Sequence, residues 1–237
     1  MRRLPLSFLS ALLLSCAAPA QETPHSSLEQ VLQAQDHDSH GDLRAVVVLR
    51  EGAIVAERYY NGETADTLHD IRSAGKSITA LLVGTAVARG QLATTKTAGD
   101  YWPEVAGNHP KGQGNLSLRA RDTAKIGQMV LDDGVVDGKP VIDAAWIKAA
   151  LAPRVAIGTV DRYADSYGYF WYAKTQDIGG QKIAVHFASG NGGNKIYVIP
   201  ARRMVVSIAS SAYGKGYGQR RSEDILKAIL KADATQM

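Results

Sequence analysis

The sequence predicts an α+β domain in which an antiparallel β-sheet is flanked by helices. Three observations lead to this prediction. β-rich segments occur in two groups, helical periodicity fills the stretch between them, and an amphipathic helix follows the second group. Grouped strands favour α+β organisation, because a parallel sheet needs strands and helices in alternation. The 237 residues, 45% of them hydrophobic, are enough for one substantial core.

The first group of strands has the pattern of a hairpin. Residues 43–50 and 53–60 are rich in β-branched and aromatic side chains and flank the turn signal Glu51-Gly52. A second turn signal follows at Asn61-Gly62. We expect the later strands at residues 166–173, 182–187, 195–199 and 204–210.

Several segments have the patterning of helices. The longest spans residues 71–92, where Ile78, Leu81 and Thr85 recur at three- and four-residue spacing and Gly90 lies near the end. We expect the others at residues 27–34, 120–134, 143–151 and 222–232.

Residues 1–20 have the organisation of a secretory signal peptide. Two arginines precede an apolar stretch at residues 4–14, which is too short to span a bilayer, and Ala18-Pro19-Ala20 is a small-x-small cleavage site. We therefore expect export to the periplasm. Leu13-Leu14-Ser15-Cys16 also resembles the cleavage site of bacterial lipoproteins, so membrane anchoring through a lipidated Cys16 is the alternative.

After cleavage, we expect a flexible segment with a short helix at residues 21–42 and one domain at residues 43–237. Cys16 is the only cysteine, which excludes a disulfide, a thiol nucleophile or a cysteine metal site in that domain. The His- and Asp-rich run at residues 36–42 is interpreted as a solvated loop, because its candidate ligands are crowded and have no obvious distant partner. No metal or organic cofactor is therefore expected.

The charge distribution gives no support for a nucleic-acid partner. The net charge is only +4, and no cluster of lysines and arginines is interleaved with aromatic residues. The pairs Arg202-Arg203 and Arg220-Arg221 are interpreted as solvated surface charge.

Ser73 and Lys76 are the candidate catalytic residues. Residues three apart on a helix lie on one face, about 5–6 Å apart at Cβ, so the lysine amine can reach the serine hydroxyl. A serine hydroxyl needs a base to become a nucleophile, and a lysine whose pKa is lowered by burial or by a neighbouring cation can act as one. The N-terminus of a helix also favours an oxyanion. The alternative is that Ser73 only caps the helix and Lys76 is solvated.

The glycine-rich segment from Ala188 to Asn194 is a second candidate site. Its glycines allow the backbone to approach a ligand closely. A phosphate loop is excluded, because the Rossmann spacing and Gly-Lys-Ser/Thr are both missing and no helix follows. Ser189 is not in a nucleophile elbow, since Phe187 stands where the first glycine of Gly-x-Ser-x-Gly is required. An ordinary hairpin turn is the alternative interpretation.

The segment from Ile71 to Gly84 resembles the nucleophile helix of the β-lactamase-related serine hydrolases. This family includes class C β-lactamases, DD-peptidases, family VIII esterases and 6-aminohexanoate-dimer hydrolases. Segments at residues 115–128, 133–146, 167–171 and 188–200 resemble later parts of the family in the same order. This collinearity covers most of residues 43–232 and implies a β-lactamase/transpeptidase-like fold.

The resemblance also implies roles for individual residues. Ser73 would be acylated and Lys76 would assist proton transfer. The backbone N–H groups of Ser73 and of a residue near Asn191 would form the oxyanion hole. Ser189 and Gly190 would contribute to substrate binding, because Ala188-Ser189-Gly190 stands where penicillin-recognising members have Lys-Thr-Gly.

Two departures from the family pattern affect the expected activity. Ala188 replaces the lysine that attracts a substrate carboxylate, and His186 lies two residues away, which favours neutral ester or amide substrates. The long helical insertion that follows the segment resembling residues 101–104 is largely missing, which implies a reduced helical lobe. The Tyr-x-Asn carried by that region, whose phenol shares the base role, does not occur in the chain.

The sequence therefore predicts an exported serine hydrolase that acts on a small ester, amide, β-lactam or peptidoglycan-like substrate. Esterase or amidase activity is favoured over efficient β-lactamase activity. A catalytically impaired binding module that keeps the scaffold is the main alternative, and an unstable incomplete product is a third.

Overall fold

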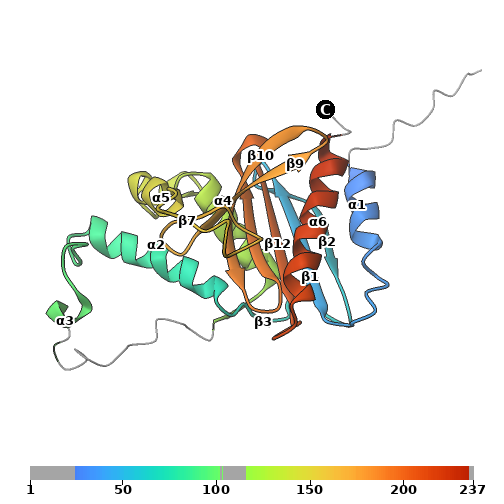
Figure 1. Ribbon diagram of the computed structural model, residues 1–237, viewed down its shortest axis with the longest axis horizontal. Coiled ribbons are helices and arrows are strands. Elements are labelled where there is room, and N and C mark those ends of the chain that lie inside the picture. The colour runs from blue at the N-terminus through green and yellow to red at the C-terminus, as the bar shows by residue number, and fades with distance from the viewer. Residues whose placement is uncertain (1–24, 102, 104–115, 235–237) are drawn as a thin grey trace, which may run out of the picture.

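The computed structural model describes residues 25–101, 103 and 116–234. Its centre is an eight-stranded antiparallel sheet in the order β2-β1-β12-β11-β10-β9-β8-β7, with helices on both faces (Figure 1). The predicted α+β class is confirmed. The strands of this sheet are β1 (Leu43–Arg50), β2 (Ala53–Tyr59), β7 (Val155–Ala156), β8 (Ser166–Tyr167), β9 (Tyr172–Ile178), β10 (Gln181–Gly190), β11 (Asn194–Ile199) and β12 (Met204–Ser210).

The helices divide between the two faces of the sheet. Helices α1 and α6 lie side by side on one face, and α4 packs on the other, where α2 and α5 also lie (Figure 1). Figure 1 also labels α3 beyond the far end of α2. The described helices are α1 (His25–Gln33), α2 (Ala74–Ala88), α3 (Ala98–Tyr101), α4 (Ala120–Leu131), α5 (Ala144–Leu151) and α6 (Tyr217–Ala234).

The sheet is buried on both faces, which explains the continuous apolar runs in its central strands. Side chains of a strand alternate between the two faces. In β1, Val46 and Val48 therefore join the core under α1 and α6, whereas Ala45 and Val47 join the core under α2, α4 and α5. The run of residues 43–50 lacks a polar alternation because neither of its faces meets water.

Short strands and one 3-10 helix complete the described fold. The pair β3–β4 connects the segment before α2 to the segment before α4, and the pair β5–β6 follows α4. The bounds of these elements are β3 (His69–Asp70), β4 (Ser117–Leu118), β5 (Val135–Val136), β6 (Lys139–Pro140) and the 3-10 helix Pro200–Arg202.

Two strand predictions need correction. Residues 166–173 form two strands, because the chain turns between β8 and β9, where Phe170 has a left-handed φ of 60°. Gly168 fits in this turn because a Cβ there would lie 2.3 Å from the carbonyl oxygen of Ala150. The expected turn at residues 188–194 is also shorter than predicted, because β10 continues through Gly190 and β11 begins at Asn194.

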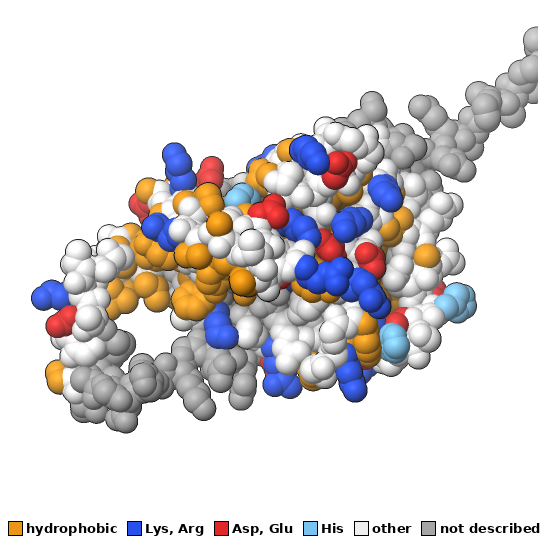
Figure 2. Space-filling view, viewed as in Figure 1, with side chains coloured by type: hydrophobic (Ala, Val, Ile, Leu, Met, Phe, Trp, Pro, Cys, Tyr) orange, Lys and Arg blue, Asp and Glu red, His pale blue; other side chains and the backbone are white. Residues whose placement is uncertain are grey.

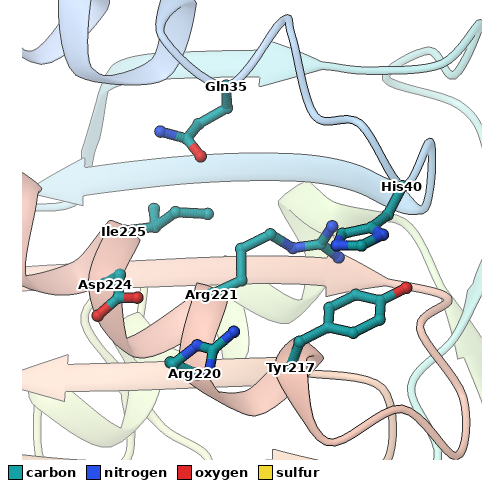
Figure 3. Close-up of a pocket in the computed structure, with 7 residues that line it drawn as sticks. All are labelled: Gln35, His40, Tyr217, Arg220, Arg221, Asp224 and Ile225. Atoms are coloured by element: carbon teal, nitrogen blue, oxygen red, sulfur yellow. The ribbon is translucent and has the colours of Figure 1, made fainter.

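The His- and Asp-rich run at residues 36–42 is a mostly exposed loop, as predicted, but Asp38 and Asp42 within it are not solvated. Arg221 of α6 lies 2.6 Å from a carboxylate oxygen of Asp38 and 2.6 Å from one of Asp42, and all three side chains are mostly buried. His40 stacks on the ring of Tyr217, with 3.9 Å between ring centroids. Figure 3 shows Arg221 reaching toward His40 beside Tyr217, in a pocket of about 280 Å³. The loop before β1 therefore binds α6 through ion pairs and a ring contact.

The basic pair Arg202-Arg203 is also partly buried and paired with carboxylates. Arg202 has a side chain only 5% exposed, and its Nε lies 3.6 Å from a carboxylate oxygen of the buried Asp233. Arg203 is half exposed and donates to the carbonyl oxygen of Leu131. The interpretation as solvated charge is wrong for Arg202 and Arg221, because carboxylates on neighbouring elements compensate their burial.

Hydrophobic side chains also reach the surface around α2 (Figure 2). Leu82 is 63% exposed and Val83 is 38% exposed. No helix within the described ranges is long and apolar enough to cross a membrane, and no group of three or more metal-binding side chains occurs there. The predicted signal peptide with Cys16 lies outside the described residues. So do residues 104–115, the short segment that stands where the family has its long helical insertion.

Candidate active site

Ser73 stands immediately before the first residue of α2, and the structure brings it together with Lys76. The Lys76 Nζ atom donates to the Ser73 Oγ atom at 2.9 Å. Both residues are half-buried. The three-residue spacing therefore produces the contact that the sequence predicted. Ser73 makes no side-chain capping hydrogen bond to α2, so its hydroxyl is not engaged as a helix cap.

The backbone before Ser73 has an unusual conformation. Arg72 has a φ of 53°, in the left-handed region that non-glycine residues seldom occupy. Its N–H donates to the Asp70 carboxylate at 2.9 Å, and its guanidinium lies 4.1 Å from the ring centroid of Tyr213. Tyr213 in turn donates to the carbonyl oxygen of Asp70 at 3.0 Å. These contacts hold the sharp turn that presents Ser73.

Helix α2 is fixed against its neighbours along its length. The hydroxyl of Ser77 donates to the carbonyl oxygen of Phe170 at 2.6 Å. The indole of Trp146 on α5 donates to the carbonyl oxygen of Ala80 at 2.9 Å. A Cβ at Gly84 would lie 2.0 Å from the Trp146 ring, so only glycine permits this approach. Ser73 and Lys76 therefore lie on a rigid element.

The end of β10 touches the beginning of α2. A Cβ at Gly190 would lie 2.1 Å from the carbonyl oxygen of Ile71 and 3.2 Å from the backbone nitrogen of Ala74. The glycine is required for this contact. The connection to β11 then turns through Gly192 and Gly193, which have φ values of 85° and 94°. The glycine-rich segment thus lies beside Ser73, although the two are more than a hundred residues apart.

The backbone N–H groups of Ser73, Asn191 and Gly192 have no acceptor within the described part of the chain. Those of Ser73 and Asn191 are the pair that the family resemblance assigns to the oxyanion hole. Both oxygen atoms of Asn191 are engaged: its carbonyl oxygen accepts from the Asn194 side chain, and its Oδ1 accepts from the N–H of Gly214, each at 2.9 Å. Unpaired N–H groups near a helix N-terminus are suited to binding an oxyanion.

Ser189 does not join Ser73. Its neighbour Ala188 packs in the core on the α2 side, so alternation along β10 directs Ser189 to the α6 side. There, the Lys195 Nζ atom donates to the Ser189 Oγ atom at 2.8 Å. The proposed role of Ser189 in substrate binding stays a prediction, and its hydroxyl faces away from the site.

Lys195 is a buried amine that the sequence analysis missed. It is 3% exposed, and its Nζ lies 4.5 Å from the ring centroid of Phe187. Burial lowers the pKa of Lys195 to about 7. A lysine directly before the apolar run at residues 196–199 was the available signal, because a charged side chain in such a strand is seldom buried without a reason.

No tyrosine replaces the phenol of the missing Tyr-x-Asn. All ten tyrosines lie within the described ranges, and none makes a hydrogen bond with Ser73 or Lys76. Tyr101 accepts from the N–H of Ala93, and Tyr167 interacts with Tyr172. His186, the other candidate for anion recognition, is half-buried, and its Nδ1 has no partner within the described part of the chain. Burial lowers the pKa of His186, which favours its neutral form.

Comparisons with known proteins agree with the resemblance found in the sequence. The Beta-lactamase family model matches residues 28–119. A penicillin-binding protein homologue from Caulobacter crescentus is similar in structure, with a TM-score of 0.68 and 14% identity over 89% of this chain and 98% of the other. A family VIII carboxylesterase has a TM-score of 0.60 and 13% identity over 87% and 98%.

A β-lactamase from Mycobacterium bovis is also similar, with a TM-score of 0.55 and 12% identity over 78% of this chain and 93% of the other. No curated protein matches the sequence. These identities establish the fold alone. The β-lactamase/transpeptidase-like fold predicted from the sequence is confirmed.

Proposed function

We propose that the chain is a serine hydrolase that forms an acyl-enzyme at Ser73, because it has a β-lactamase/transpeptidase-like fold and matches the Beta-lactamase family model over residues 28–119. The contact of 2.9 Å between Ser73 Oγ and Lys76 Nζ is the observation that carries this proposal. The unpaired N–H groups of Ser73 and Asn191 support it, because they can bind the oxygen of a substrate carbonyl.

The reaction begins with Lys76 in its amine form. In that form the Ser73 hydroxyl donates its hydrogen bond to Lys76 Nζ. Ser73 Oγ then bonds to the carbonyl carbon, the carbonyl electron pair moves onto oxygen, and Lys76 takes the hydroxyl proton. The oxyanion accepts from the N–H groups of Ser73 and Asn191. Its collapse expels the alkoxide or amine, which takes the proton from Lys76.

Hydrolysis of the acyl-enzyme follows the same steps in reverse. A water molecule gives a proton to Lys76 and bonds to the acyl carbon, and the bond from that carbon to Ser73 Oγ breaks. The acid leaves, and Ser73 regains its proton. One residue, Lys76, thus serves as base and acid in turn. This assignment needs no tyrosine, in agreement with the absence of a tyrosine hydrogen bond to either residue in the described ranges.

Small neutral esters or amides are the proposed substrates. Ala188 is fully buried and apolar in the position that resembles the carboxylate-attracting lysine, so an anionic substrate gains no ion pair there. The signal-peptide pattern at residues 1–20 supports export to the periplasm, or anchoring through Cys16, as the setting of this activity.

A second candidate function is a binding module on the same scaffold. The missing phenol favours it, because a lone lysine must then carry every proton transfer. Retention of peptidoglycan in a pelleting assay distinguishes the two. A binding module retains peptidoglycan equally well as wild type and as Ser73→Ala, and it releases no product from esters.

Hydrolysis of p-nitrophenyl acetate tests the proposed function. We expect burst kinetics in the wild type, followed by slower steady turnover as water hydrolyses the acyl-enzyme. Ser73→Ala should abolish both phases. The matched control is Ser39→Ala, which changes an exposed serine in the loop before β1 and should leave both phases unchanged. Equal turnover by wild type and Ser73→Ala would contradict the proposal.

A further inference from the structure

The first turn of α6 reaches the backbone beside the candidate oxyanion N–H. The Gln219 Nε2 atom donates to the carbonyl oxygen of Gly190 at 2.8 Å. The start of α6 is pressed against the same loop, because a Cβ at Gly193 would lie 2.3 Å from the carbonyl oxygen of Gly218. The hydroxyl of Ser222 donates to the carbonyl oxygen of Gly193 at 2.6 Å. Gln219 is therefore part of a close, well-packed contact.

The carbonyl that Gln219 binds and the N–H of Asn191 belong to one peptide unit. A peptide bond is planar and trans, so its C=O and N–H point in opposite directions. Holding the Gly190 carbonyl toward Gln219 therefore turns the Asn191 N–H away from α6. The other side of Gly190 faces Ile71 and Ala74, at the beginning of α2.

A second set of contacts fixes the orientation of the Gln219 amide. The Lys195 ammonium has only donors, so the Ser189 Oγ atom must accept from it. The Ser189 hydroxyl then directs its own proton to Gln219 Oε1, at a long distance of 3.5 Å. With Oε1 used as an acceptor, the NH₂ group of Gln219 faces the Gly190 carbonyl.

We propose that Gln219 is a positioning residue that aims the Asn191 N–H at the substrate oxygen, and that Lys195, through Ser189, sets the orientation of its amide. This inference rests on the proposed function. Gln219 lies on the opposite side of the peptide from the reacting atoms and acts only through Asn191.

The surroundings of Lys195 make this arrangement sensitive to pH. Burial lowers the pKa of Lys195 to about 7, while Asp161 and Glu223 raise it and Lys174 lowers it. Glu223 on α6 pairs with Lys174 of β9 at 2.7 Å. Tyr163 and Tyr197 line the same small cavity as Lys195. Above pH 7 the neutral amine can accept from Ser189, which removes the constraint on the Gln219 amide.

The test compares p-nitrophenyl acetate with its thionoester, in which sulfur replaces the carbonyl oxygen. Sulfur accepts hydrogen bonds weakly, so the oxo-to-thiono ratio of kcat/KM reports on the oxyanion donors. Gln219→Glu keeps the size but removes the donor. We expect its kcat and its oxo-to-thiono ratio to fall about tenfold, with KM within about twofold. In the wild type, the ratio should fall as pH rises through about 7.

A second test variant and a control variant accompany Gln219→Glu. Gln219→Met also lacks a donor and should give the same result if the glutamate variant fails to fold, as judged by a thermal melt. Arg220→Gln changes the exposed neighbour on α6 and should match the wild type. A wild-type ratio in folded Gln219→Glu or Gln219→Met overturns the inference.

Failure of the proposed function gives a different result. If the wild type forms no acyl-enzyme, the proposed function is wrong, and the inference is then judged by the ¹⁵N–¹H resonance of Asn191. Gln219→Met should move or broaden that resonance, and Arg220→Gln should not. An unchanged Asn191 resonance in folded Gln219→Met overturns the positioning role.

Discussion

Lys76 donates a hydrogen bond of 2.9 Å to Ser73 across the first turn of α2. Neither residue makes a hydrogen bond with a tyrosine in the described ranges. In the proposed mechanism, the base role that the family pattern divides between two groups therefore falls on the lysine alone. The proposed chemistry depends on this pair and on the backbone that surrounds it.

Lys76→Met should reduce the rate of acylation. Removing a positioned base costs about 10²–10⁴ in rate, so we expect a loss in that range with p-nitrophenyl acetate, measured by stopped-flow burst kinetics. Lys76→Arg is the informative control, because arginine keeps the charge and a donor but cannot accept the proton. Its loss should match that of Lys76→Met. Acylation by Lys76→Arg at the wild-type rate would contradict the base role.

Gly190→Ala should damage the site and the fold together. The new Cβ would lie 2.1 Å from the carbonyl oxygen of Ile71, so the strand end and the beginning of α2 must separate. We expect a loss of about 1–3 kcal/mol in the free energy of unfolding, measured with urea, and slower acylation. Gly216→Ala is the matched control, since a Cβ there meets nothing within 4 Å. Equal stabilities of the two variants would contradict the close contact.

Arg221→Met should destabilise the protein through the loss of two ion pairs. Asp38 and Asp42 would stay mostly buried without a cation, which costs about 3 kcal/mol in the free energy of unfolding. Arg220→Met, at the exposed neighbouring position, should change it by less than about 0.5 kcal/mol. Urea unfolding at pH 7 measures both. Similar losses of unfolding free energy in Arg221→Met and Arg220→Met would mean that the buried ion pairs of Arg221 do not stabilise the protein.

The effect of Arg221→Met should also depend on pH. Burial raises the pKa of Asp38, but the hydrogen bond from the Leu43 N–H and the charge of Arg221 outweigh burial, and the net pKa lies below 3.8. The stabilisation by Arg221 is therefore complete above that ordinary value and is lost as pH falls through the lower value in the folded state. The difference in the free energy of unfolding between the wild type and Arg221→Met should therefore become smaller as the pH falls below 3.8.

Lys195 should make the stability rise with pH above neutrality. Its pKa is about 7 in the folded protein against an ordinary value of 10.5. Between these values the unfolded chain binds more protons, so the free energy of unfolding rises by about 1.4 kcal/mol per pH unit. Below pH 7 both states are protonated and the slope from this residue vanishes.

Lys195→Met removes this slope. Urea unfolding at pH 6, 7, 8 and 9 measures the free energy of unfolding of the variant and the wild type. The difference between these two free energies should be constant up to pH 7 and should change above pH 7. A difference that stays constant from pH 6 to pH 9 would show that the buried amine has an ordinary pKa.

The parts of the fold that the sequence predicts well are those determined by local patterns. The hairpin at residues 43–60 and the helix after Ser73 follow from periodicity and turn residues, and β1, β2 and α2 begin or end within a few residues of the prediction. The split of residues 166–173 was missed, because the turn there depends on the fit of Gly168 against the distant Ala150 carbonyl.

The site divides in the same way. Ser73 and Lys76 could be predicted because they are three residues apart on one helix. Gln219 and Lys195 could not, because they reach Gly190 and Ser189 only when α6 and β11 pack beside β10. Arg221 was misinterpreted for a related reason: its acidic partners, Asp38 and Asp42, lie near the other end of the chain.

The central claim is that Ser73 is a nucleophile, and covalent labelling tests it most directly. The full chain is incubated with a fluorophosphonate probe and analysed by intact-mass and peptide mass spectrometry. The account predicts one adduct, located on Ser73, which disappears in Ser73→Ala, persists in Ser39→Ala and forms much more slowly in Lys76→Met. An unlabelled wild type with a cooperative thermal melt, or an adduct located on another residue, would contradict it.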